Sequence, residues 1–227
     1  RGRPGHSSVP HGDNAIAHLG KVLQALGAKK MPHRVTRSGG AFIEGIAEAQ
    51  RRPEVRDLAL KLLDPAEADA ALNQLPVDEP TRLMLDATLR NTCAPTMMNA
   101  GLKRNVIPSE ARVSLSGRPL PGVDEATFMK ELREIVGEEI EIETEEARPF
   151  SPANEFDHET ELFDAIRASV SRFDPEAAVA PHLSTGGTDA RWLAHLDIQI
   201  YGFMPMRWEP NFNFYELAHG HDERVST

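Results

Sequence analysis

The sequence has little cysteine, no long apolar run and no excess of basic charge. A single cysteine, Cys93, excludes an intramolecular disulfide framework, and we expect a reducing, cytoplasmic environment. No apolar run approaches the ~20 residues of a membrane-spanning helix, so we expect no membrane partner. Acidic residues outnumber basic ones by 35 to 25, a net charge of −10. This balance argues against nucleic acid as a partner, because nucleic-acid-binding proteins concentrate basic residues on one face.

An initiator methionine is also missing. The chain begins with Arg1, and no signal-peptide pattern follows, so we expect it to be part of a longer protein. Its 227 residues suffice for one large domain or two small ones. Its content of 40% apolar and 26% charged residues is that of an ordinary globular protein.

Helix-like patterns occur throughout the first two thirds of the chain. One helix with apolar residues on a single face is expected to begin at Asp13 and end at Gly27. Another is expected to begin at Asp124 and end at Gly137. Between them, residues 28–88 show short helical patterns broken by prolines and glycines, which we interpret as a helical insertion.

Two segments, residues 111–116 and 139–145, alternate apolar and polar side chains as half-buried strands do. The alternation makes the glutamates of the second segment a solvated strand face rather than a paired-carboxylate site. With an extended N-terminal segment, the predicted order is strand, helix, insertion, strand, strand, helix, strand. This is the order of the ferredoxin-like split βαβ fold, an α+β arrangement with helices on one face of an antiparallel sheet.

A loop at residues 148–154 indicates a boundary between two domains. The expected domains are residues 1–147, which contain the insertion at about 28–88, and residues 148–227. We expect the second domain to be part of an α/β domain in which a helix follows the loop. Strands are predicted there at residues 177–180 and 197–204.

The stretch HGHDE at residues 219–223 is the strongest candidate for chemistry, because imidazole is a common metal ligand and a neighbouring carboxylate can orient it. If the stretch is a strand, His219 and His221 share one face and could both bind zinc. If it is a loop before a helix, only one of them need face a metal. An ordinary solvated loop is the third alternative.

Three polar residues of the first domain are further candidates. His6, in GRPGHSSVP, could donate a hydrogen bond to an oxyanion or could be an exposed turn residue. Asn105, just before a strand, could bind a substrate carboxylate or could shape a turn. Arg118, in SGRPLPG, has the same ambiguity.

The stretch STGGTDAR places glycines and threonines before a short predicted helix. Its backbone N–H groups and the Arg191 guanidinium could bind an anion, or the stretch could be a simple connection between a strand and a helix. It lacks the lysine and the spacing of a nucleotide-binding phosphate loop.

Taken in order, four motifs resemble one known family: GRPGHSSVPHGDNAI, KRNVIPSEARVSLSGRPLPG, STGGTDAR and HGHDER. Their order and spacing are similar to those of metallopeptidase family 20, which includes aminoacylases, glutamate carboxypeptidase and succinyl-diaminopimelate desuccinylase. The resemblance implies hydrolysis of an amide bond in a small peptide or N-acyl amino acid by a catalytic domain with two zinc ions. It also implies an inserted lid domain through which two copies form a homodimer.

The resemblance assigns a role to each matching residue. His6 matches the lid histidine that stabilises the oxyanion in the partner subunit's active site, and Asn105 matches a lid asparagine that holds the substrate carboxylate. Arg118 matches the arginine at the end of the following strand. His219 matches the last zinc ligand, which implies that His221 is not a ligand. The catalytic-domain loop that lines the substrate pocket is matched by Gly187, Thr188 and Arg191.

The chain departs from the family where the family has most of its zinc ligands. The expected His-x-Asp motif, bridging aspartate and Glu-Glu pair have no counterpart in the expected context, since His11-Gly12-Asp13 lies inside the lid motif. Ser116 also stands where the family often has an aspartate. One histidine cannot hold a two-zinc site, because catalytic zinc needs about three protein ligands. We therefore expect this chain alone to be inactive, and the alternatives are an assembly module or a catalytically dead homologue.

Overall fold

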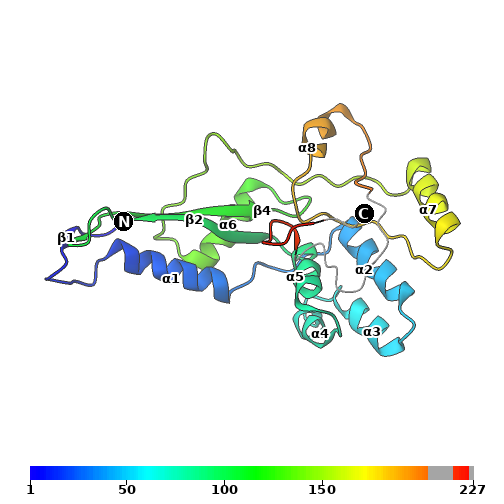
Figure 1. The fold of residues 1–227 in the computed structure, drawn as a ribbon, viewed down its shortest axis with the longest axis horizontal. Helices are drawn as coiled ribbons and strands as arrows, with labels where there is room; N and C mark the ends of the chain where they lie inside the picture. Colours follow the sequence, from blue (N-terminus) through cyan, green and yellow to red (C-terminus); the bar gives the residue numbers. More distant parts are fainter. Residues whose placement is uncertain (204–216, 225–227) are drawn as a thin grey trace. The chain divides into compact units, whose positions relative to one another are not determined.

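The structure is a computed structural model that describes residues 1–203 and 217–224 and divides into two compact units (Figure 1). Helices and small antiparallel sheets occur together, which confirms the predicted α+β class. The two units comprise Arg1–Pro32 with Arg90–Ala153 (unit 1) and His33–Leu89 with Asn154–Thr227 (unit 2).

The helical segment His33–Leu89 belongs to unit 2 because its side chains contact the C-terminal part of the chain. The Arg37 guanidinium lies 2.9 Å from the Asp157 carboxylate. The Phe42 ring packs edge-on against His182, with ring centroids 4.7 Å apart. The segment interpreted as an insertion into residues 1–147 thus groups with residues after 153, through contacts that local patterns do not encode.

Helix α1 (Ala15–Ala28) lies close to its predicted position, although its cap differs. Asn14 is the N-cap, and its side-chain oxygen accepts a hydrogen bond from the Ile16 amide at 2.9 Å. The predicted cap, Asp13, lies one residue earlier, and its carbonyl oxygen instead accepts a hydrogen bond from the Arg3 amide at 3.0 Å. The predicted apolar face contributes three buried residues, Ala15, Leu19 and Val22.

Helix α6 (Glu125–Val136) begins and ends as predicted. The Asp124 carboxylate accepts a hydrogen bond from the Thr127 amide at 2.8 Å. Hydrogen bonding from the side chain of Thr127, together with that from its amide, lowers the pKa of Asp124. Gly137 follows the last turn with φ of 101°, a conformation that an L side chain rarely adopts. α6 contacts α1, and α1 also packs on the two-stranded sheet of unit 1 (Figure 1).

Unit 1 contains two separate two-stranded antiparallel sheets. In the longer one, β2 (Thr92–Ala100) pairs with β4 (Ala111–Arg118), with an irregularity in register between Pro95 and Met97. β4 contains the predicted strand at residues 111–116. In the shorter sheet, β1 (Gly5–His6) pairs with β3 (Val106–Ile107).

The predicted strand at residues 139–145 is not a strand in the structure. Ile140 and Ile142 are half-buried and the glutamates between them are exposed, so the alternation in burial is present. This segment contacts β4 through side chains, for example in the 3.3 Å ion pair between Arg112 and Glu143. A strand needs a hydrogen-bonded neighbour, which alternation does not supply. The four-stranded ferredoxin-like sheet therefore stays a prediction.

Unit 2 is built around a cluster of four short helices: α2 (Arg37–Ala49), α3 (Pro53–Lys61), α4 (Ala68–Gln74) and α5 (Glu79–Thr88). Their core includes Ile43, Leu62 and Leu89, which are at most 1% exposed. The described part of the unit also contains α7 (Glu161–Phe173), α8 (Ala190–Leu193) and the 3-10 turn η1 (Ala194–Leu196).

The strands predicted for unit 2 are absent where the structure describes them. Met204 lies outside the described residues. Residues 177–180 and 198–203 belong to no strand or helix, and Asp197 is a turn residue with a left-handed φ of 56°. Their contacts are with helices and loops, for example the 3.1 Å hydrogen bond from the Asp157 amide to the Gln199 side chain. No helix in the described ranges is long and apolar enough to cross a membrane.

Candidate functional site

The short β1–β3 ladder brings together two candidate residues from the two separate sequence segments of unit 1. His6 pairs with Val106, and the Ser7 amide donates a hydrogen bond to the carbonyl oxygen of Asn105 at 3.1 Å. The side chains of His6 and Asn105 are both exposed. Two hydrogen-bonding side chains 99 positions apart (105 − 6) therefore lie at one tip of unit 1.

Contacts of His6 with Ser8 fix the tautomer of the neutral imidazole. The Ser8 amide donates to His6 Nδ1 at 3.2 Å, and the Ser8 hydroxyl lies 2.7 Å from the same nitrogen. A backbone amide can only donate, so Nδ1 must accept and the ring proton resides on Nε2. The Nε2–H group is thus available to donate a hydrogen bond to an oxygen atom outside the tip.

Backbone contacts hold this tip in place. The Gly2 amide donates to the Ser109 carbonyl at 2.9 Å. A Cβ atom on Gly2 would lie 2.6 Å from the backbone nitrogen of Ala15, so the close approach requires glycine. The imidazole of His11 packs beneath Gly5, where an added Cβ would meet Nε2 at 3.1 Å.

Arg118 is not part of this tip. It pairs with Thr92 at one end of the β2–β4 sheet, whereas Ala111 and the connection to β3 are at the other end. Seven residue steps along a strand correspond to about 24 Å. Figure 1 shows β1 beyond the Ala111 end. Unit 1 therefore offers His6 with Asn105 at one end and the exposed Arg118 at the other.

The predicted pocket loop of unit 2 is an exposed turn before α8. Gly187 and Thr188 lie in the turn, and the Thr188 hydroxyl accepts a hydrogen bond from the Ala190 amide at 3.3 Å. The Arg191 guanidinium stacks over the Trp192 ring, 4.6 Å from its centroid. The turn keeps these three candidate residues close together on the surface.

His219 lies in a turn rather than a strand, so the alternative in which His219 and His221 share a strand face is wrong. Its φ of 61° is left-handed, and both histidine side chains are exposed. The carboxylate of Asp222 is paired with Arg224. No group of three or more potential metal ligands occurs in the part of the chain that the structure describes. Because catalytic zinc needs about three protein ligands, the described residues do not fit a catalytic zinc site.

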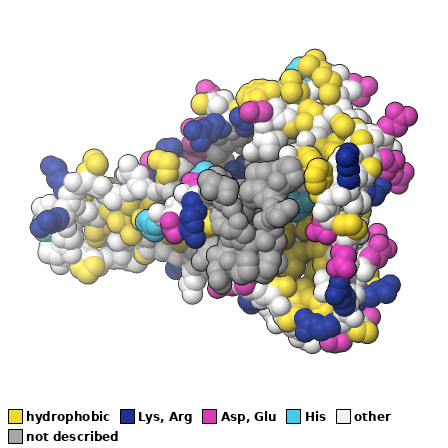
Figure 2. All heavy atoms as spheres, turned by 45° about the vertical axis from the view of Figure 1, so that its right-hand side comes forward, with side chains coloured by type: hydrophobic (Ala, Val, Ile, Leu, Met, Phe, Trp, Pro, Cys, Tyr) yellow, Lys and Arg dark blue, Asp and Glu magenta, His cyan; other side chains and the backbone are white. Residues whose placement is uncertain are grey.

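Two further features bear on chemistry. Burial raises the pKa of the Cys93 thiol to about 11, so this thiol is protonated and is a poor nucleophile at neutral pH. Among the described residues visible in Figure 2, acidic and basic side chains are interspersed.

The role of Ser8 in fixing the His6 tautomer did not follow from the sequence. The only signal was the serine pair after the histidine in GRPGHSSVP, which does not reveal which group faces Nδ1.

Comparisons with known proteins agree with the motif pattern. The family model for the peptidase dimerisation domain of the M20 peptidases matches residues 1–144. The probable carboxypeptidase S-like 2 of Dictyostelium discoideum is 28% identical over 224 residues, which are 98% of this chain and 41% of that protein. The N-fatty-acyl-amino acid synthase/hydrolase PM20D1 of Bos taurus is 28% identical over 231 residues, 98% of this chain and 43% of that protein.

The chain spans about two fifths of the length of these curated relatives. The comparison with solved structures found no significant match. The family model covers more than half of the chain, and it includes both His6 and Asn105. The chain therefore belongs to the M20 metallopeptidase family and contains its peptidase dimerisation domain.

Proposed function

We propose that the whole protein is a zinc-dependent amidohydrolase that cleaves an amide bond in a small peptide or an N-acyl amino acid. Family membership supports an amide hydrolase, and the relatives are named as a probable carboxypeptidase S-like protein and as N-fatty-acyl-amino acid synthase/hydrolases. The observation that carries the proposal is the tip of unit 1, where His6 and Asn105 lie together with the Nε2–H group of His6 directed away from Ser8. We propose a cytoplasmic location on the basis of the single cysteine.

In the proposed reaction, His6 stabilises the oxyanion of the tetrahedral intermediate. The neutral imidazole donates its Nε2–H to the developing negative charge, a contribution that exists only in the transition state. Asn105 donates its amide N–H to the carboxylate of the substrate, which orients the scissile bond. We propose that Arg118, Gly187, Thr188 and Arg191 also contact substrate. For the whole protein we propose zinc as the metal, with His219 as one of its ligands.

We further propose that two copies associate through unit 1, so that His6 acts in the partner's site. Strand β2 supports this proposal: it pairs only with β4 among the described strands, and its Met97 and Met98 side chains are 72% and 64% exposed. Exposed apolar side chains on an edge strand favour association with another chain. The same surface supports the alternative in which this chain serves only as an assembly module.

Sedimentation of the Met97→Glu/Met98→Glu double variant tests the association. Charged side chains should convert the dimer to monomer because like charges would face each other across the shared surface. Leu83→Glu, which changes a 61% exposed leucine of α5, is the control and should remain dimeric. A wild-type protein that sediments as a monomer at high concentration would contradict the proposed association.

Hydrolysis of N-acyl amino acids by the whole protein tests the catalytic proposal. His6→Ala should lower kcat about 10²- to 10³-fold with little change in KM, because the lost donor acts mainly in the transition state. Asn105→Ala should mainly raise KM. His18→Ala is the matched control, because His18 is a histidine of α1 and not of the β1–β3 ladder. Unchanged kcat in His6→Ala would refute the role of His6, and inactivity of the wild-type whole protein would favour the assembly module or a dead homologue.

A further inference from the structure

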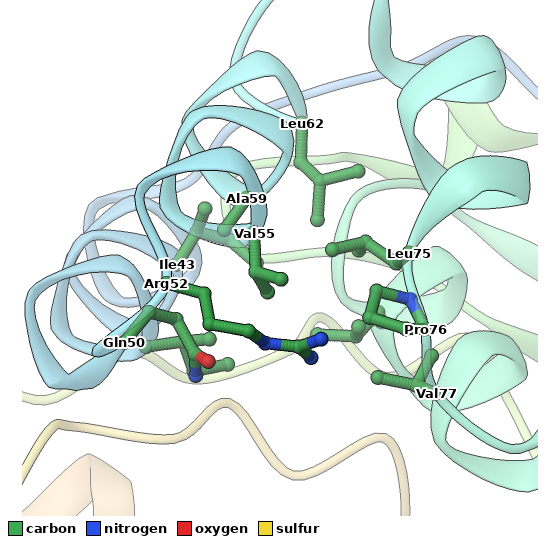
Figure 3. Close-up of a pocket in the computed structure, with 11 residues that line it drawn as sticks. Ile43, Gln50, Arg52, Val55, Ala59, Leu62, Leu75, Pro76 and Val77 are labelled. Carbon is green, nitrogen blue, oxygen red and sulfur yellow. The ribbon is translucent and has the colours of Figure 1, made fainter.

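A cavity of about 100 Å³ lies within the helical cluster of unit 2 (Figure 3). Six of its lining side chains are almost completely buried and aliphatic: Ile43, Val55, Ala59, Leu62, Leu75 and Leu85. A wall of this kind gives a water molecule no hydrogen-bonding partners. Apolar cavities accept apolar guests instead, and one of about 150 Å³ holds a benzene molecule.

Gln50 and Arg52 are the polar residues that line this cavity. Figure 3 shows the Arg52 side chain extending from the start of α3 toward Pro76 and Val77, with Gln50 beside it. Arg52 is exposed. Within the described ranges its guanidinium has no hydrogen bond or ion pair, whereas that of the adjacent Arg51 lies 3.2 Å from Glu176.

An unpaired guanidinium beside an aliphatic cavity favours a ligand with an anionic head and an apolar tail. A carboxylate matches the guanidinium in charge and in the spacing of its two oxygen atoms. The amide of Gln50 can donate a further hydrogen bond to the same head group. An amine would place a second positive charge beside Arg52 and should be rejected.

We propose that this cavity is a binding site for short aliphatic carboxylates, with the alkyl chain inside and the carboxylate on Arg52 and Gln50. The volume limits the length of the chain. Benzene places six carbon atoms in about 150 Å³, so a cavity of about 100 Å³ takes about four. A carboxyl carbon at the opening and four carbons inside correspond to pentanoate.

This inference is independent of the proposed amide hydrolysis. The cavity residues lie between Ile43 and Leu85, a segment that contains none of the candidate site residues. Failure of either proposal would therefore leave the other intact.

A chain-length series tests the site in the whole 227-residue chain. Acetate, propanoate, butanoate, pentanoate, hexanoate and octanoate are titrated while the methyl resonances of Ile43, Val55 and Leu85 are followed by NMR. Affinity should rise about fourfold with each methylene up to pentanoate and then level off. Equal affinity for acetate and pentanoate would overturn the proposal, as would methyl shifts confined to other parts of the chain.

Two arginine variants test the head-group contact. Arg52→Met should weaken pentanoate binding at least tenfold and leave pentanol binding unchanged, because it removes charge but keeps an apolar stem. Arg56→Met, in the helix that Arg52 caps but outside the cavity lining, should alter neither affinity. Equal pentanoate affinity in the two variants would overturn the proposal. Wild-type methyl spectra away from the cavity confirm that each variant is folded.

Discussion

The buried side chain of Asn91 should be a major contributor to the stability of unit 1. Only 1% of this residue is exposed. Its side-chain nitrogen donates to Glu131 of α6 at 2.7 Å, and its side-chain oxygen accepts from the Leu120 amide at 2.7 Å. Asn91 thereby joins the start of β2 to α6 and to the turn before it.

Replacement by alanine removes both hydrogen bonds and leaves two buried polar groups without this partner. The Leu120 amide and the Glu131 carboxylate are both shielded from water, and Glu131 is 5% exposed. A buried group that loses its partner costs about 1–3 kcal/mol. Asn91→Ala should therefore lower the free energy of unfolding by about 2–6 kcal/mol, a large part of the ordinary stability of a domain.

Urea denaturation followed by circular dichroism measures this loss, and hydrogen exchange at the Leu120 amide localises it. The matched control is Asn99→Ala, an exposed asparagine of β2, which should change stability by less than about 0.5 kcal/mol. The double variant Asn91→Ala/Glu131→Ala should lose less than the sum of the single variants, because the two side chains are hydrogen-bonded. Equal stability of Asn91→Ala and Asn99→Ala would refute the reasoning.

Two other perturbations have defined outcomes. Gly2→Ala should loosen the tip that holds His6, because the added Cβ would lie 2.6 Å from the Ala15 nitrogen; faster amide exchange at Ser7 measures the effect. Gly12→Ala, where nothing lies within 4 Å of the added atom, should leave that exchange unchanged. The Cys93 thiol, whose pKa burial raises to about 11, should react with thiol reagents at pH 8 about a hundredfold more slowly than free cysteine. Burial raises the pKa of this thiol in the folded protein above its value in the unfolded chain, so the stability that the protonated thiol contributes is present at neutral pH and is lost as the pH rises toward 11. Reaction of Cys93 at the rate of free cysteine would contradict its burial.

Local sequence signals predicted the elements whose limits depend on nearby residues. Asp124 and Gly137 delimit α6 because a carboxylate cap and a left-handed glycine act within one turn. The predicted cap of α1, Asp13, was wrong by one residue, because Asp13 and Asn14 are both good caps and the difference lies in backbone direction.

Sequence patterns did not predict which strands pair with each other over long distances in the chain. Alternation at residues 139–145 correctly indicated that Ile140 and Ile142 are half-buried, whereas Thr144 is exposed. It did not reveal that a hydrogen-bonded partner strand is absent. His6 and Asn105 lie close together because of a β ladder of only two residue pairs, which is too short to produce a periodic pattern in the sequence. Family resemblance, rather than local physics, singled out these two residues.

A complementation assay with the whole protein tests the central claim most directly. His6→Ala lacks the proposed oxyanion donor and His219→Ala lacks the proposed zinc ligand, so each variant alone should be nearly inactive. If His6 acts in the partner's site, a mixed dimer has one site with both residues intact. Random mixing in equal amounts yields half mixed dimers, so activity should recover to about one quarter of the wild-type value. Recovery to that level is the predicted result, and a mixture no more active than its separate components would contradict the account.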